Sequence, residues 1–217
     1  MVEPYLGGSH AAWAYGYQAH SRHQVALISH PDRFWKWRMH GGAVTLARQF
    51  LRRDRDPDLI VATDMLDLTT FLALTRHKTA RLPVVIYFHE NQICYPWSPK
   101  DRDILQKRDH HYGFINYSSA LAADLVVFNS VYHQTAFFDA LPRFLKQFPE
   151  PHDLISQKRY PDIFYRNFDD LVEKLADALL SIETIRQQSF RHCVESYSWQ
   201  HMAPVYDTIF GAVQAWR

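Results

Sequence analysis

Cysteine is scarce in this chain of 217 residues, which has only two thiols, Cys94 and Cys193. Two distant thiols argue against a disulfide scaffold and favour a reducing compartment. Net charge is almost absent as well, at +1 for pH 7. Because no global basic field exists, a nucleic-acid partner would have to be held by a local patch of the surface.

Long hydrophobic runs are also missing, and no segment approaches the ~18 apolar residues that a membrane-spanning helix needs. The first residues, MVEPYLGGSH, lack the basic-then-apolar order of a secretory leader. We therefore expect a cytoplasmic protein with no membrane partner. The sequence leaves the oligomeric state open.

Several catalytic motifs are absent too. The chain contains no GxGxxG, no P-loop, no GxSxG elbow and neither HExxH nor CxxC spacing. It does have thirteen histidines, including His110 and His111 beside Asp109. Adjacent histidines diverge by about 100° on a helix, so this trio is a poor ligand set. We predict no metal site.

What the sequence does contain is a regular alternation of strands and helices over its first two-thirds. Three of the expected strands, around Ile60, Ile86 and Val126, are nearly continuous apolar runs, which is typical of a parallel sheet buried on both faces. We therefore predict an α/β fold with a Rossmann-like domain over residues 1–150. Residues 151–217 are expected to form a linker and C-terminal helices. The strands are expected at 2–5, as a short remnant, and at 24–30, 58–64, 84–89 and 124–130, and the helices at 11–20, 43–53, 68–75, 108–123, 134–148, 168–182, 184–197 and 198–216.

Two local features qualify these helices. Ser9 is a natural N-cap for the first helix, and Pro142 predicts a break in the helix over 134–148.

Polar residues follow the predicted strands, at the carboxyl ends where open α/β sheets bind ligands. They are Gly7, Gly8, Ser9 and His10, then Asp64, then His89, Glu90, Asn91 and Gln92, then Asn129 and Ser130. A buried polar cluster costs free energy unless it is satisfied. We interpret the set as a substrate-binding edge, with His89 able to donate to a sugar hydroxyl and Glu90 able to act as a base. The alternative is that these residues form tight turns and cap neighbouring loops.

The stretch RFWKWRMH interleaves three cations, Arg33, Lys36 and Arg38, with aromatic rings. Such interleaving can hold an RNA backbone and stack bases. It is equally consistent with the entry of a helix packed on the sheet.

Taken together, GGSH, RFWKWR, YFHENQICYP, RDHHYGFINYSSALAADLVVFNSVYH and FFDALPRFLKQFPEPHDL resemble the N-terminal domain of the tRNA-queuosine alpha-mannosyltransferase family. That family belongs to the retaining GT-B glycosyltransferases. The resemblance implies transfer of mannose from GDP-mannose to queuosine in tRNA, with no metal and no cofactor. It places the Gly7–His10 loop near the donor phosphates and His89 at the transferred sugar. Glu90 and Asn91 would shape the acceptor side, with Asn129 and Ser130 at the next strand end.

The sequence departs from this family after Leu154, where a donor domain on the order of 100–150 residues is expected and the chain passes directly to its last helices. We therefore expect the donor half of the cleft to be missing, which leaves open whether the chain is an enzyme. Two alternatives stand beside the mannosyltransferase. One is a non-catalytic module that binds tRNA or another partner, and the other is a glycosyltransferase for a different sugar donor and acceptor.

Overall fold

The sheet has five parallel strands in the order β2-β1-β3-β4-β5. The computed structural model describes residues 1–54, 56–106, 111–147 and 198–214. The strands are β1 Val2–Leu6, β2 Ile28–Pro31, β3 Ile60–Thr63, β4 Val84–Phe88 and β5 Leu125–Phe128. The predicted α/β, Rossmann-like fold class is therefore confirmed.

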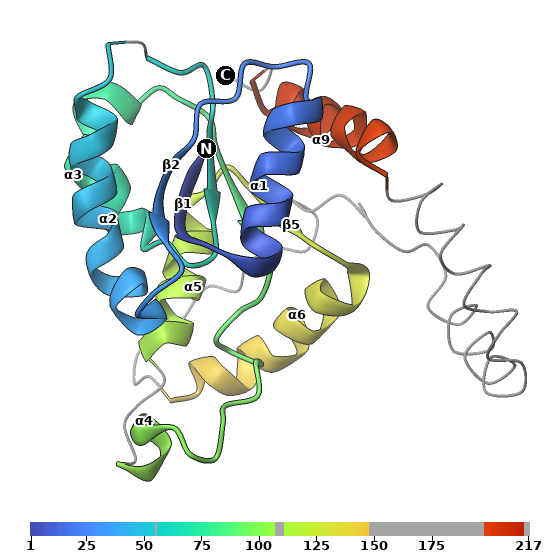
Figure 1. The fold of residues 1–217 in the computed structure, drawn as a ribbon. Helices are drawn as coiled ribbons and strands as arrows, with labels where there is room; N and C mark the ends of the chain where they lie inside the picture. The colour runs from blue at the N-terminus through green and yellow to red at the C-terminus, as the bar shows by residue number, and fades with distance from the viewer. Residues whose placement is uncertain (55, 107–110, 148–197, 215–217) are drawn as a thin grey trace, which may run out of the picture.

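Helices cover both faces of this sheet (Figure 1). They are α1 Gly8–His20, α2 Trp35–Leu51, α3 Leu68–Thr79, α4 Arg102–Leu105, α5 His111–Ala122, α6 Val131–Leu145 and α9 Trp199–Gln214. Helices α2, α3 and α5 lie on one face, and α1 and α9 on the other. This two-sided cover explains why β4 is hydrophobic at every position.

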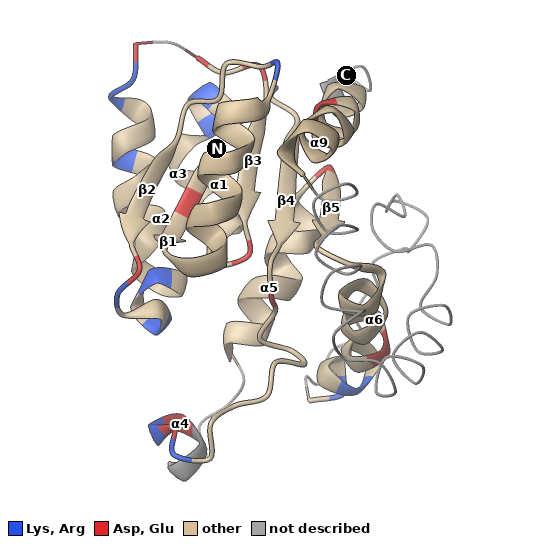
Figure 2. Cartoon of the chain, turned by 45° about the vertical axis from the view of Figure 1, so that its right-hand side comes forward, with Lys and Arg blue, Asp and Glu red and all other residues tan. Residues whose placement is uncertain are grey.

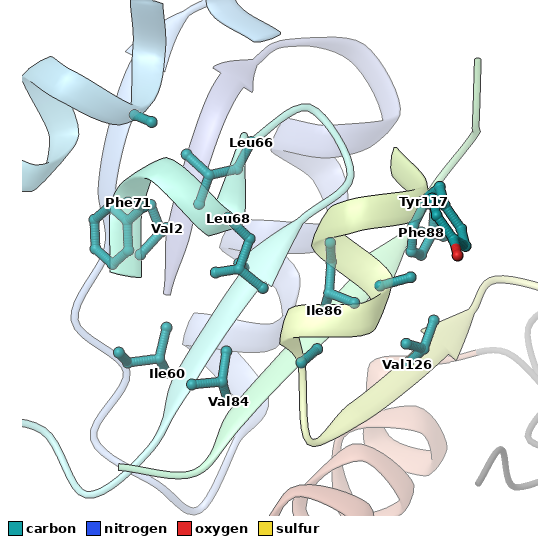
Figure 3. Packing of buried hydrophobic residues seen from close by; sticks show 14 of the residues in the cluster. Val2, Ile60, Leu66, Leu68, Phe71, Val84, Ile86, Phe88, Tyr117 and Val126 are labelled. Carbon is teal, nitrogen blue, oxygen red and sulfur yellow. The ribbon is translucent and has the colours of Figure 1, made fainter. Parts of the chain in front are cut away.

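The strands divide their side chains between two cores by simple alternation. Even-numbered positions such as Ile60, Ile86 and Val126 pack with α2, α3 and α5, whereas odd-numbered ones such as Val85 and Val127 pack with α1 and α9. Strands β3, β4 and β5 carry no charged residue (Figure 2). Figure 3 shows the first core, in which side chains of neighbouring strands meet Leu68 and Phe71 of α3. Burying each such large apolar side chain stabilises the fold by about 1.5–3 kcal/mol.

Two local predictions are wrong. Ser9 does not cap the first helix, because the helix already begins at Gly8, its N-cap is Gly7, and no side chain caps it. Pro142 does not break α6, which continues to Leu145. A proline inside a helix removes one backbone hydrogen bond. The apolar face of α6, with Phe137, Leu141 and Phe144 buried, outweighs that loss.

The last helix, α9, lies against α1. The indole of Trp199 occupies the space beside Gly16, where an added Cβ would lie 1.9 Å from the ring. Asp207, which is 2% exposed, accepts hydrogen bonds from the hydroxyls of Tyr17 and Ser21 and from the backbone N–H of Arg22. Residues nearly 190 positions apart in the sequence therefore form one core.

The helices predicted over 168–182 and 184–197 lie outside the described residues, as does the predicted domain boundary near residue 150, which stays a prediction. Within the described part of the chain, no helix combines the length and the apolar character needed to cross a membrane.

Candidate active site

The polar residues predicted from the strand ends do meet at one edge of the sheet. The rings of His10 and His89 have centroids 4.1 Å apart, although one follows β1 and the other β4. The backbone N–H of His89 donates to Asp64 Oδ1 at 2.8 Å. Asn129 Nδ2 donates to the carbonyl of His89, also at 2.8 Å. Residues that follow the three strands β1, β3 and β5 thus surround His89, which itself follows β4.

His10 forms a buried pair with Glu3, a residue that the sequence analysis did not single out. Glu3 lies in β1 with 0% exposure. Its Oε2 is 3.1 Å from His10 Nδ1, and its Oε1 accepts from the N–H of Tyr5 at 2.8 Å. The available signal was a carboxylate inside a strand, since a buried charge of this kind requires a partner.

The environment of His10 stabilises its charged form. Burial by itself would lower the pKa of this imidazole. The hydrogen bond to Glu3 and the carboxylates of Asp64 and Glu90 act in the opposite direction and raise the pKa to about 9. His10 is therefore an imidazolium at neutral pH, fixed at the start of α1.

His89 has the opposite character. Burial, together with the nearby His10 and His133, lowers its pKa well below the usual range, so its imidazole is neutral. Its Nε2 atom is buried and has no hydrogen-bond partner among the described residues. A buried polar atom in this state costs free energy, and a hydroxyl of a bound ligand can satisfy it.

Two carboxyls complete the charged part of the site. Burial raises the pKa of Asp64 to about 7, although His10 and the N–H of His89 oppose the change. Burial also raises the pKa of Glu90, against the influence of His10 and a hydrogen bond from Gln92. Gln92 Nε2 donates to Glu90 Oε1 at 3.2 Å. The structure therefore gives Gln92 the role of orienting Glu90.

Asn91, Asn129 and Ser130 organise the loops beside the site through a residue that the sequence analysis missed, His133. Its Nε2 lies 2.7 Å from Asn91 Nδ2 and its Nδ1 lies 2.9 Å from Asn129 Oδ1. Ser130 caps α6 by accepting from the N–H of His133. These contacts fit the capping alternative for the three residues.

The glycine loop before α1 allows a close approach of two segments. An added Cβ at Gly7 would lie 2.2 Å from Cβ of Asp32, so only glycine fits there. Gly8 has φ +51°, in the left-handed region that glycine adopts readily. Because no side chain caps α1, its first N–H groups are left for water or a ligand. Ser9 is exposed beside them.

The three predicted RNA contacts differ in their surroundings. Arg33 is exposed, whereas Arg38 is half-buried. Lys36 forms ion pairs with Asp101 and Asp103 and lies over the Trp35 and Trp97 rings at 5.4 and 5.1 Å. Its charge therefore fastens the loop before α4 to α2. Figure 2 shows the basic positions at the start of α2, at the end of the sheet toward which β4 points.

One set of side chains could hold a metal ion. Glu3, His10 and His89 each offer a ligand atom, and these atoms lie within 4.8 Å of one another. A metal would have to displace the proton shared by His10 and Glu3, because metal-bound imidazole is deprotonated. The absence of a metal stays a prediction. Of the other histidines considered for a metal, His111 instead lies with its Nε2 atom 2.9 Å from that of His40, and Asp109 and His110 lie outside the described residues.

A cavity of about 660 Å³ lies at the opposite end of the sheet, where Met1, Arg53 and Asp58 are among its lining residues. None of the predicted site residues lines it. We place the candidate site at the carboxyl edge, because the perturbed ionisable groups and the unpartnered His89 atom gather there.

Comparison with known proteins agrees with this architecture. The family model described as tRNA-queuosine alpha-mannosyltransferase N-terminal matches residues 1–160. The tRNA-queuosine alpha-mannosyltransferase of Drosophila melanogaster is 34% identical over 151 residues, which cover 69% of this chain and 38% of that protein. No solved structure matches significantly. The chain thus spans well under half of that relative, and its fold and sequence show that it belongs to the tRNA-queuosine alpha-mannosyltransferase N-terminal family.

Proposed function

We propose that this chain supplies the acceptor-side half of a glycosyltransferase cleft, in which mannose passes from GDP-mannose to queuosine in tRNA with retention of configuration. The observation on which the proposal rests is His89, a half-buried neutral histidine whose buried Nε2 atom has no partner in the described part of the chain. It lies between a charged histidine and the carboxyl of Glu90, at the strand edge where such sheets bind ligands.

In this proposal His89 binds a hydroxyl of the transferred sugar. A neutral imidazole nitrogen can donate or accept one hydrogen bond, depending on its tautomer. Burial, together with repulsion from the neighbouring His10 cation, keeps His89 neutral, so the atom remains able to exchange a hydrogen bond with an uncharged sugar. Glu90 accepts from the attacking hydroxyl of the acceptor, and its raised pKa suits a group that takes up a proton.

His10 and the start of α1 would face the donor diphosphate. The imidazolium is one positive charge, and the uncapped first turn of α1 adds backbone N–H groups and the positive end of a helix dipole. Negative charge grows on the leaving diphosphate as the glycosidic bond breaks. Fixed positive groups at that position stabilise the transition state more than the ground state.

Calorimetry of the chain with GDP-mannose tests the proposal, with UDP-glucose as the competing donor. Selective binding of GDP-mannose that is lost in His89→Ala and kept in His77→Ala, which removes an exposed histidine on α3, would support contact of this half of the cleft with the donor. Absence of binding would indicate that donor binding needs the other half of the cleft. Mannose transfer to queuosine-containing tRNA is then assayed with the same variants and with Glu90→Ala. Binding and transfer that are indifferent to His89→Ala would refute the role of the site, and preference for UDP-glucose would indicate a different donor.

A second candidate function is a tRNA-binding module without catalysis. It is favoured by a specific surface at the start of α2, where Phe34 is 78% and Trp37 69% exposed, beside the exposed Arg33. A chain that binds tRNA with steep salt dependence but neither binds GDP-mannose nor transfers mannose would support this function over the first.

A further inference from the structure

The two most exposed large apolar side chains of the described residues are neighbours in the first turn of α2. Phe34 is 78% exposed and Trp37 is 69% exposed. They are three positions apart, with Phe34 at the N-cap position in a left-handed conformation and Trp37 in the first turn of the helix. The Trp37 indole lies along the helix over Gly41, where an added Cβ would be 3.2 Å from the ring. Two aromatic rings are therefore exposed to solvent at the start of α2.

The backbone at Phe34 is strained. With φ 57° and ψ 54° it is the one non-glycine among the described residues with a positive φ. A bulky residue in this region costs free energy that is normally repaid by other contacts. Because the Phe34 ring is mostly exposed, packing within this chain repays little of it. The strained backbone places the Phe34 ring in solvent, and the strain lowers the stability of the fold.

The charges beside the two rings are positive on balance, with Arg33 and Arg38 against the single carboxylate of Asp32. Arg33 is exposed directly before Phe34, and Arg38 follows Trp37. Two nearby carboxylates are engaged elsewhere, since Asp101 and Asp103 pair with Lys36. Asp32 lies against Gly7 but is exposed, so one carboxylate remains beside Arg33. A polyanion approaching the rings would thus meet two guanidinium groups and the positive end of α2.

This surface adjoins the candidate active site. Asp32, two residues before Phe34, touches the Gly7 loop that leads into His10. Figure 2 shows the basic start of α2 at the same end of the sheet as the carboxyl ends of β4 and β5. A molecule bound in the cleft can therefore extend over both rings.

From this geometry we propose that Phe34 and Trp37 form a platform on which unpaired bases of an RNA hairpin loop stack, while Arg33 and Arg38 bind the flanking phosphates. The inference rests on the proposed function, since it names the part of the RNA acceptor that lies outside the reacting nucleoside. Unpaired bases expose flat faces to aromatic rings, whereas a duplex buries those faces in its own stack.

Fluorescence anisotropy with a labelled RNA hairpin tests the platform, with a duplex of the same stem as the second probe. We expect Phe34→Gly and Trp37→Ser each to weaken hairpin binding about fivefold to a hundredfold and to leave duplex binding unchanged. Phe34→Gly should also raise the melting temperature, because glycine adopts the observed backbone without strain. Tyr15→Ser, which removes a 54% exposed aromatic on α1, is the matched control and should change neither.

Several outcomes would overturn the platform. One is hairpin binding that neither substitution changes, and another is an equal loss of hairpin and duplex binding. A third is a melting temperature lowered by Phe34→Gly. The last is a dimer of the native chain in sedimentation that the substitutions abolish, because the rings would then form a protein interface. GDP-mannose calorimetry on the same variants separates this inference from the proposed function. Donor binding kept without ring-dependent hairpin binding refutes the platform alone, and the reverse pattern refutes the donor site alone.

Discussion

Replacing Glu3 by glutamine removes the charge that holds His10 in its protonated form while preserving the shape of the side chain. In the native chain the pKa of His10 is raised to about 9 from the usual 6.5. Because His10 is only 6% exposed, solvent screens this interaction little. The displacement corresponds to ~3 kcal/mol of stability at 1.36 kcal/mol per pKa unit. Since Asp64 and Glu90 contribute part of it, we assign ~2 kcal/mol to Glu3.

The sign of the effect follows from the direction of the shift. A histidine whose pKa is higher in the folded state contributes stability that is complete below pH 6.5 and is lost as pH rises toward 9. The stability advantage of the native chain over Glu3→Gln should therefore be largest at pH 6.5 and shrink by ~2 kcal/mol by pH 9.

Urea unfolding followed by circular dichroism measures this difference at a series of pH values. Asp139→Asn, which removes an exposed carboxylate on α6, is the control and should run parallel to the native chain. The amino group of Met1, whose pKa burial and Arg53 lower to about 5, changes stability in the opposite direction between pH 5 and 8. It is present in every variant, so it cancels in the comparison. A difference that stays constant from pH 6.5 to 9 would refute a charged His10.

The remaining predictions concern the contact between α9 and α1. Asp207→Ala should lower the free energy of unfolding by about 3–5 kcal/mol in urea titrations, because Tyr17 and two further donors lose a buried charged acceptor. A loss below about 1 kcal/mol would contradict this prediction. Gly16→Ala should destabilise the chain by at least 1–3 kcal/mol, since its Cβ would clash with the Trp199 ring. At Gly211 on α9 an added Cβ would have only one neighbouring atom within 4.0 Å, so Gly211→Ala should instead stabilise the chain by about 1 kcal/mol. Equal effects of the two glycine substitutions would show that α9 does not pack as described.

Several features of the site were predictable from the sequence because they depend on chain order alone. Apolar runs such as that around Ile86 identify buried parallel strands, and parallel strands bring their carboxyl ends to one edge. His10, Asp64 and His89 could therefore be assigned to one site before any coordinates. The competition between a residue's local preference and its tertiary surroundings was harder to predict, as Ser9 and Pro142 show. Other residues than Ser9 decided where α1 begins, and other residues than Pro142 decided that α6 continues.

The sequence by itself determined the fold class, the edge at which polar residues gather and the family to which the chain is similar. The tertiary structure alone decided which of those residues are charged. His10 is a cation because the carboxylate of Glu3 lies 3.1 Å from it, and His89 is neutral because it is buried beside His10 and His133. It also decided that Lys36 binds two carboxylates while Phe34 and Trp37 are left on the surface. Burial and pairing depend on distances between segments far apart in the chain, and no local pattern encodes those distances.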